Sequence, residues 1–134
     1  MKIILLVYAA LVASASAYLY QDTDLESSIQ RGKDLYSDFC VTCHMANGEG
    51  VANVFPPLAN SDYLAQNREE SIRGVKFGQS GQIVVNGTTY DNLMVAPGLE
   101  DEEIADVMNF VMNSWGNSSD QPVTQEEVTG ILPN

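Results

Sequence analysis

The chain has 134 residues, the size of one domain, and its 18 acidic residues against 6 basic ones give a net charge of −12. Such a charge argues against nucleic acid and against anionic membrane surfaces as partners, because both repel an acidic protein. It favours a partner with a basic or apolar docking face, and we expect the chain to act as a monomer.

Residues 1–17 have the pattern of a secretory signal peptide. Lys2 precedes an apolar run over residues 3–13, and Ala15-Ser16-Ala17 has the form of a cleavage site. A helix of that run reaches about 16 Å, about half of the ~30 Å hydrocarbon layer of a membrane. We therefore predict export to the periplasm and removal of residues 1–17. Retention as an uncleaved membrane anchor is the alternative.

Residues 18–26 are acidic, and we expect them to form a flexible leader. A helical pattern follows from Ser27, with apolar and aromatic residues at three- and four-residue steps: Ile29, Leu35, Tyr36, Phe39, Cys40 and Cys43. Gly32 interrupts this pattern, although glycine inside a helix costs about 1 kcal/mol relative to alanine. Close crossing by another helix would explain the glycine.

Both cysteines and the only histidine stand together as Cys40-Val41-Thr42-Cys43-His44. The spacing C-x-x-C-H is typical of covalent haem attachment, since thiols one helical turn apart can bond both vinyl groups of one porphyrin. His44 is then the proximal iron ligand. The rival interpretations are weaker: structural zinc needs four ligands, a thioredoxin-like dithiol follows a strand, and a disulfide over this span is strained.

After His44 the sequence predicts a turn at Asn47–Gly50 and then a stiff extended segment, Phe55-Pro56-Pro57-Leu58. A metal-bound histidine needs a hydrogen-bond acceptor at its other ring nitrogen, and a proline carbonyl can serve. Either Pro56 or Pro57 could fill that role, or the two prolines only shape the loop.

The sequence in the middle of the chain predicts two short helices and a β-hairpin. One helix begins around residues 60–62, and a second covers Asn67–Arg73 and stops before Gly74. Residues 82–90 then predict a β-hairpin, because β-branched residues flank the turn Asn86-Gly87.

The last strong helix starts with Glu100–Glu103, whose charges suit a helix N-terminus. Its apolar stripe comprises Ile104, Val107, Met108, Val111 and Trp115, and Gly116 is the expected stop. Residues 118–134 form a polar tail in which Thr124 can cap one more short helix.

With one histidine in the chain, the second iron ligand must be of another type, and methionine is the usual partner in haem c proteins. Met45 is adjacent to His44 and cannot reach the opposite face of the ring. Met108 and Met112 fall on the last helix, where methionine usually fills a core. Met94 lies in a loop and is the expected ligand, ahead of the less usual lysines.

Several segments resemble the class I monohaem cytochromes c, in their small bacterial periplasmic form that also occurs as haem domains of oxidases, nitrite reductases and dehydrogenases. These segments lie within residues 27–117: Gly32-Lys33-x-x-Tyr36, Cys40-x-x-Cys43-His44, Phe55-Pro56-Pro57-Leu58-Ala59, Met94 and Asn113-Ser114-Trp115-Gly116-Asn117. The resemblance implies an all-α fold with crossed N- and C-terminal helices, short middle helices and a small β-hairpin insertion, with Gly32 facing Phe110.

The resemblance also implies one covalent haem c on Cys40 and Cys43, with His44 and Met94 as axial ligands and a proline carbonyl behind His44. The expected function is electron transfer between periplasmic or membrane redox partners by an iron that cycles between Fe(II) and Fe(III). The chain would then be an electron carrier or a subunit of a larger enzyme, and no enzyme itself. The alternative is a haem-based sensor or a small catalytic haem protein with an open sixth site.

Overall fold

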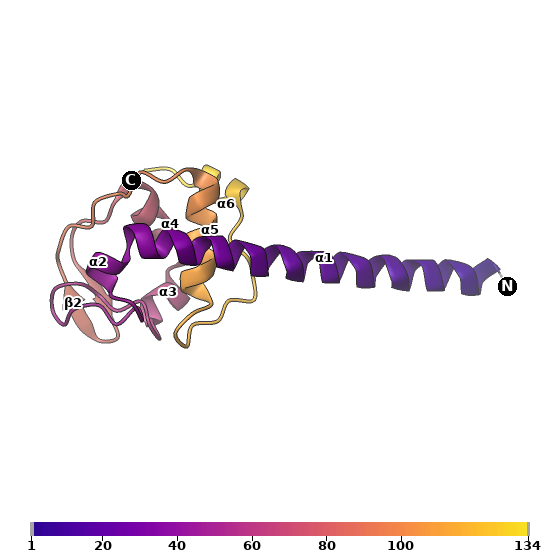
Figure 1. Cartoon of the computed structure of the whole chain (residues 1–134), viewed down its shortest axis with the longest axis horizontal. Coiled ribbons are helices and arrows are strands. Elements are labelled where there is room, and N and C mark those ends of the chain that lie inside the picture. The colour runs from indigo at the N-terminus through magenta and orange to yellow at the C-terminus, as the bar shows by residue number, and fades with distance from the viewer. Residues whose placement is uncertain (1, 134) are drawn as a thin grey trace.

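The computed structural model describes residues 2–133, and within them all side chains except those of residues 2–3 and 14–23. Its elements are α1 (Lys2–Phe39), α2 (Val41–His44), α3 (Asp62–Gln66), α4 (Arg68–Phe77), β1 (Ile83–Val85), β2 (Thr88–Tyr90), α5 (Asp101–Met112) and α6 (Gln125–Gly130). The helical fold with short middle helices and one antiparallel hairpin confirms the expected class. In Figure 1 the N-terminal part of α1 projects from a domain formed by the other elements.

Helix α1 is continuous through residues 18–26, where we expected a flexible leader. This segment contains no proline or glycine, so nothing in its backbone chemistry ends the helix. The apolar side chains nearer the N-terminus, from Ile4 to Val12, are largely exposed. Among the residues that the structure describes, no helix combines the length and apolar character needed to cross a membrane. Removal of residues 1–17 stays a prediction.

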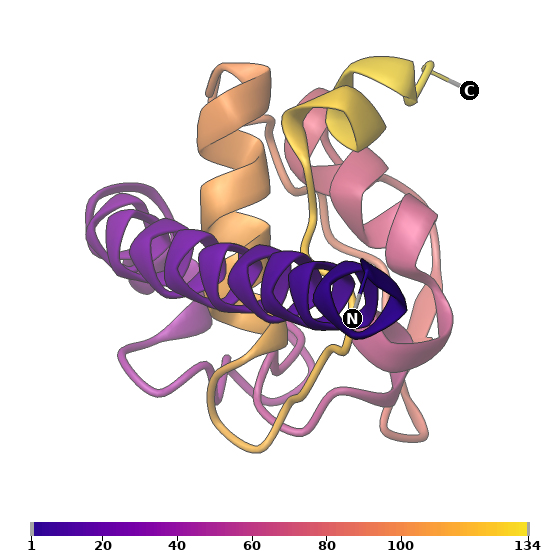
Figure 2. The same cartoon turned by 90° about the vertical axis from the view of Figure 1, so that its right-hand side faces the viewer.

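The centre of the fold is the crossing of α1 over α5, which Figure 2 shows almost along the axis of α1. Gly32 lies at this crossing. A Cβ atom on Gly32 would stand 2.0 Å from the carbonyl oxygen of Asp106 and 2.9 Å from Cβ of Phe110. Only glycine therefore lets the two backbones approach this closely, which confirms both the crossing and its partner Phe110.

We expect Gly32→Ala to lower the free energy of unfolding by about 1–3 kcal/mol, because the new methyl group meets backbone that cannot move aside. The intrinsic helix preference of alanine alone would predict a gain instead. Urea unfolding of the holoprotein measures the difference. Gly130→Ala is the matched control, since no atom lies within 4 Å of the added Cβ. Equal stability of the two variants would contradict the packing argument.

A buried polar network fastens the crossing. Asp106 is 5% exposed and accepts hydrogen bonds from Ser28 Oγ at 2.6 Å and from Arg31 Nε and Nη2 at 2.6 and 2.7 Å. Asn109 donates to Ser28 Oγ and to the carbonyl of Val123, and accepts from the Val123 amide. One network thus joins α1, α5 and the C-terminal segment, and the sequence analysis did not single out any of its polar members on α5.

The apolar stripe of α5 is buried as expected, but the helix is shorter than predicted. It ends at Met112, so Trp115 and Gly116 lie in the segment that follows it. Two asparagines explain the early end. Asn113 Nδ2 donates to the Asn109 carbonyl and Asn117 Nδ2 to the Val111 carbonyl, both at 2.9 Å. These side chains satisfy carbonyls that a longer helix would otherwise bond.

Helix α3 and the β1–β2 hairpin lie where the sequence predicts them. Ser61 Oγ caps α3 by accepting from the Leu64 amide, and the positive φ angles of Asn86 and Gly87, 50° and 77°, form the hairpin turn. Helix α4 differs from the prediction, because it passes through Gly74 and ends at Phe77. Glycine in a helix lowers stability without forcing an end.

The C-terminal tail holds the short helix that we expected, α6, whose N-cap Thr124 accepts a hydrogen bond from the Glu127 amide. Arg68 on α4 anchors this tail through its bonds to the two carboxylate oxygens of Glu127 at 2.7 and 2.8 Å. Lys76 bonds the Val128 carbonyl at 2.7 Å. The tail therefore closes over α4 and α5 as part of the domain.

Candidate functional site

The two cysteines lie at the junction of α1 and α2. The amides of Cys43 and His44 both donate to the Cys40 carbonyl, at 3.2 and 3.0 Å, so the three residues share one turn. Both thiols are free and half-buried. Cys40 and Cys43 therefore form no disulfide with each other. Their two sulfur atoms are carried by residues of the same helical turn.

The electrostatics of this turn disfavour the dithiol interpretation. Burial, with a smaller contribution from Cys43, raises the pKa of Cys40 to about 11. A redox-active cysteine needs a lowered pKa instead, because the thiolate is the reactive form. In the part of the chain that the structure describes, no group of three or more histidine, cysteine or acidic side chains could hold a metal ion.

The imidazole of His44 is buried and fixed in orientation. Its Nδ1 lies 3.0 Å from the carbonyl oxygen of Pro56. A carbonyl only accepts, so Nδ1 carries the proton and Nε2 keeps a free lone pair for a metal. Burial lowers the pKa of His44, and the bond to Pro56 opposes that shift less strongly. The ring is therefore neutral at pH 7. Of the two prolines left open by the sequence, Pro56 is the one behind His44.

Gly50 allows the loop that carries Pro56 to fold back closely, so that the Pro56 carbonyl lies next to His44. The Gly50 amide donates to the His44 carbonyl at 3.0 Å, and Val51 and Phe55 exchange two backbone hydrogen bonds. A Cβ atom on Gly50 would stand 2.4 Å from the Phe55 oxygen and 2.7 Å from the Pro56 oxygen, and its φ is +64°. A side chain at Gly50 would thus displace the acceptor of the histidine.

An aromatic cluster ties the same loop to α5. The hydroxyl of Tyr36 donates to the Met45 carbonyl at 2.7 Å. Its ring centroid lies 4.9 Å from that of Trp115 and 5.4 Å from that of Phe110. Trp115 also covers Gly48, where an added Cβ would come within 2.5 Å of the indole. The supporting roles of the Tyr36 hydroxyl and of Trp115 are absent from the sequence analysis, since neither contact is local.

Met94 is held by the segment after α4. Its amide and carbonyl exchange hydrogen bonds with the backbone of Gln79, both at 2.9 Å, and Gly78 packs against its carbonyl. Met108 and Met112 are instead buried in the core, where the sulfur of Met112 accepts from Arg68 at 3.7 Å. The contacts of these two methionines match the expected role in packing. The role of Met94 as a ligand stays a proposal.

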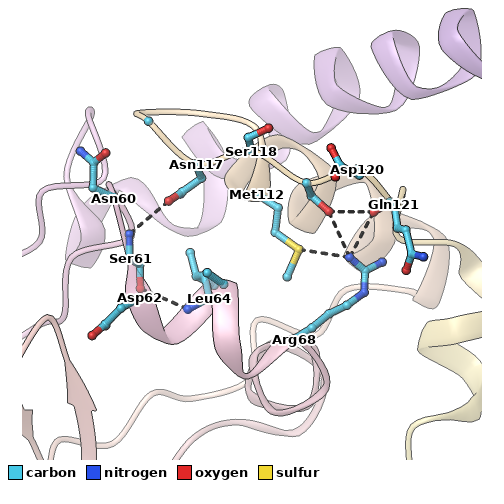
Figure 3. A pocket seen from close by; sticks show the side chains of 13 residues that line it. Asn60, Ser61, Asp62, Leu64, Arg68, Met112, Asn117, Ser118, Asp120 and Gln121 are labelled. Carbon is cyan, nitrogen blue, oxygen red and sulfur yellow. Dashed lines mark hydrogen bonds between the residues drawn. The ribbon is translucent and has the colours of Figure 1, made fainter.

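A pocket of about 770 Å³ lies between α3, the end of α5 and residues 117–121 (Figure 3). None of the four expected haem-binding residues lines it. Arg68 reaches across it to the Gln121 carbonyl at 3.1 Å, while its charge is engaged by Glu127 outside the pocket. This recess belongs to the anchoring of the tail, separate from the turn that bears the cysteines.

The donor set at the α1–α2 junction fits haem c. It offers two free thiols on one turn and a neutral imidazole whose orientation is fixed by a carbonyl. Together with the small fold built on crossed terminal helices, it defines a single-haem c-type protein.

Comparison with known proteins agrees with this class of protein. The family model described as cytochrome c matches residues 29–115. Cytochrome c-552 of Thermus thermophilus is 39% identical over 106 residues, covering 72% of this chain and 80% of the relative. The cytochrome c subunit of the quinone alcohol dehydrogenase of Gluconacetobacter polyoxogenes is 34% identical, over 75% of this chain and 22% of the relative. The chain belongs to the cytochrome c family. It binds haem c covalently and takes part in haem-based electron transfer.

Proposed function

We propose that the chain is an exported electron carrier with one haem c, bonded through Cys40 and Cys43 and ligated axially by His44 and Met94. The observation that carries this proposal is the 3.0 Å contact of His44 Nδ1 with the Pro56 carbonyl, next to two free thiols. It leaves Nε2 as the only ring nitrogen able to bind iron.

The chain's part in electron transfer is to hold both axial ligands still. Haem c, when bound, supplies an iron that alternates between the ferrous and ferric states. Pro56 fixes the ring of His44, and the two backbone bonds from Gln79 fix the segment of Met94. Ligands that move little on oxidation keep the reorganisation small. A thioether is a soft donor that stabilises ferrous iron, so this pair gives a relatively high potential.

We infer that the carrier works in the periplasm after removal of residues 1–17, and that its partners are redox proteins with a basic or apolar docking face. The acidic charge of the chain supports this, since it attracts basic surfaces. Some relatives are subunits of larger enzymes. One is the cbb3-type cytochrome c oxidase subunit FixP of Bradyrhizobium diazoefficiens, which is 31% identical to this chain. The match covers 81% of this chain and 38% of the relative. The chain serves either as a free carrier or as such a subunit.

Three measurements on the purified mature protein test this proposal. On a denaturing gel we expect the band to stain for haem, because thioether bonds survive denaturation. In cyclic voltammetry we expect one reversible one-electron wave. The intact mass is expected to match residues 18–134 plus one haem. A band without haem stain contradicts the attachment, and a stained protein without a reversible wave contradicts the carrier role.

A further inference from the structure

Lys76, in the last turn of α4, is a mostly buried cation that joins three helices. Its side chain is 16% exposed, and its ammonium nitrogen lies 3.1 Å from Oδ1 of Asp101. The same ammonium donates to the Val128 carbonyl at 2.7 Å. Asp101 is the first residue of α5, and Val128 belongs to α6. A buried lysine is stabilised only when it is paired, and both of its partners here lie on other helices.

The ion pair of Lys76 with Asp101 closes a circuit around the segment of Met94. Gln79 follows the end of α4 and exchanges two backbone hydrogen bonds with Met94, both at 2.9 Å. From Met94 the chain runs on to Asp101 at the start of α5. We call residues 76–79 and 94–101 the Met94 frame. Its two halves are joined by the backbone pairing at Met94 and, at the other end, by this one ion pair.

The C-terminal tail supports the Met94 frame. Thr129 Oγ1 donates to Oδ2 of Asp101 at 2.8 Å. That bond and the Lys76 ammonium hold the pKa of Asp101 below its usual range, so its carboxylate is charged at pH 7. Val128, next to Thr129, is fully buried in the core. Figure 2 shows α6 in yellow beside α4 in pink. The acceptors of Lys76 are therefore held in place by packing as well as by charge.

We propose that Lys76 is a positioning residue for the sixth iron ligand, because its bonds to Asp101 and Val128 keep the Met94 frame closed. This inference rests on the proposed role of Met94 as that ligand. Segments held by few contacts open locally at a free energy below that of global unfolding. The segment from Asp91 to Glu100 contains no helix or strand. Without the Lys76 ammonium the two halves of the frame can separate, and Met94 can leave the iron more often.

Imidazole added to the oxidised holoprotein measures this opening, since it binds the iron only in molecules whose Met94 has left. Its apparent affinity therefore rises with the open fraction. Loss of the weak far-red absorption band of sulfur-ligated ferric iron reports the binding. Lys76→Met removes the ammonium and keeps an unbranched side chain. We expect it to lower the apparent Kd for imidazole about tenfold, the scale of one lost hydrogen bond to a charged group. Lys76→Arg keeps the charge and is expected to stay close to the wild type.

Two control variants separate positioning from a general loss of stability or charge. Gly32→Ala weakens the crossing of α1 and α5, where the added Cβ meets Asp106 and Phe110 and no residue of the Met94 frame. Lys33→Met removes one positive charge from an exposed site on α1. Both are expected to bind imidazole as the wild type does. Asp101→Asn breaks the ion pair from its other side and is expected to tighten imidazole binding.

The outcomes separate this inference from the proposed function. If Lys76→Met binds imidazole no more tightly than Gly32→Ala does, the inference is overturned, while the role of Met94 and the carrier function stand. If Lys76→Met yields no folded holoprotein, Asp101→Asn decides by the same comparison. A wild type without the far-red band overturns the proposed ligand, and this inference with it.

Discussion

The double variant Cys40→Ser/Cys43→Ser is expected to carry no covalent haem. Serine has nearly the size of cysteine, so the backbone bonds of Cys43 and His44 to the Cys40 carbonyl can persist in the variant. Its hydroxyl cannot form the thioether to a porphyrin vinyl group. Each single variant keeps one thiol and is expected to yield less holoprotein, with one thioether at most. Haem staining on a denaturing gel and the intact mass measure the loss.

Thr42→Ser provides the matched control, because Thr42 lies between the two cysteines and its side chain is exposed. We expect normal covalent haem in this variant. A double cysteine variant that stains as strongly as the wild type would contradict attachment through these thiols. The haem of the proposed electron carrier would then have to be attached through other residues.

Features of the fold that depend on neighbouring residues were predictable from the sequence. The turn Asn86-Gly87 needs positive φ angles at both positions, and few residue pairs other than Asn-Gly supply them. Thr124 was recognisable as a cap, and residues 60–62 were recognisable as a helix start. In the structure the hydroxyls of Ser61 and Thr124 each accept from an amide three residues on. In each of these cases the partners lie within one turn of chain.

Features that depend on distant residues were not predictable. The end of α5 is set partly by Asn117, whose amide bonds the Val111 carbonyl and also the Leu58 carbonyl of a remote loop. Asp106 looks in the sequence like one more surface acid. It is buried because Ser28 and Arg31, more than 70 residues earlier, meet it at the helix crossing.

In the candidate site, too, the features that depend on neighbouring residues were predictable and those that depend on distant residues were not. The C-x-x-C-H spacing identified the thiols and the imidazole, since all of them share one turn. The choice between Pro56 and Pro57 needed the structure, because it depends on how Gly50 folds the loop back to His44. The pairing of Met94 with Gln79 has no sequence signal, as it joins two irregular segments.

Replacing Met94 is expected to have the largest effect on the iron itself. If its sulfur occupies the sixth site, the oxidised wild type shows a weak sulfur-to-iron charge-transfer band in the far red. The reduced form then binds carbon monoxide poorly. Met94→Ala is expected to abolish that band, open the site to carbon monoxide and lower the midpoint potential, because a soft donor to ferrous iron has been removed. Absorption spectra and voltammetry measure all three changes.

Met108→Ala and Met112→Ala are the controls, since both residues are buried in the core. Each is expected to keep the far-red band and to lower the free energy of unfolding by about 2–5 kcal/mol, the usual cost of the cavity left by a truncated core side chain. If Met108→Ala lost the band and Met94→Ala retained it, the assignment of Met94 would be wrong. The sixth ligand would then be Met108, in the core. A wild type that lacks the band and binds carbon monoxide readily would have an open sixth site. The function would then be that of a haem-based sensor or small catalytic haem protein, because an iron open to added ligands is suited to bind them.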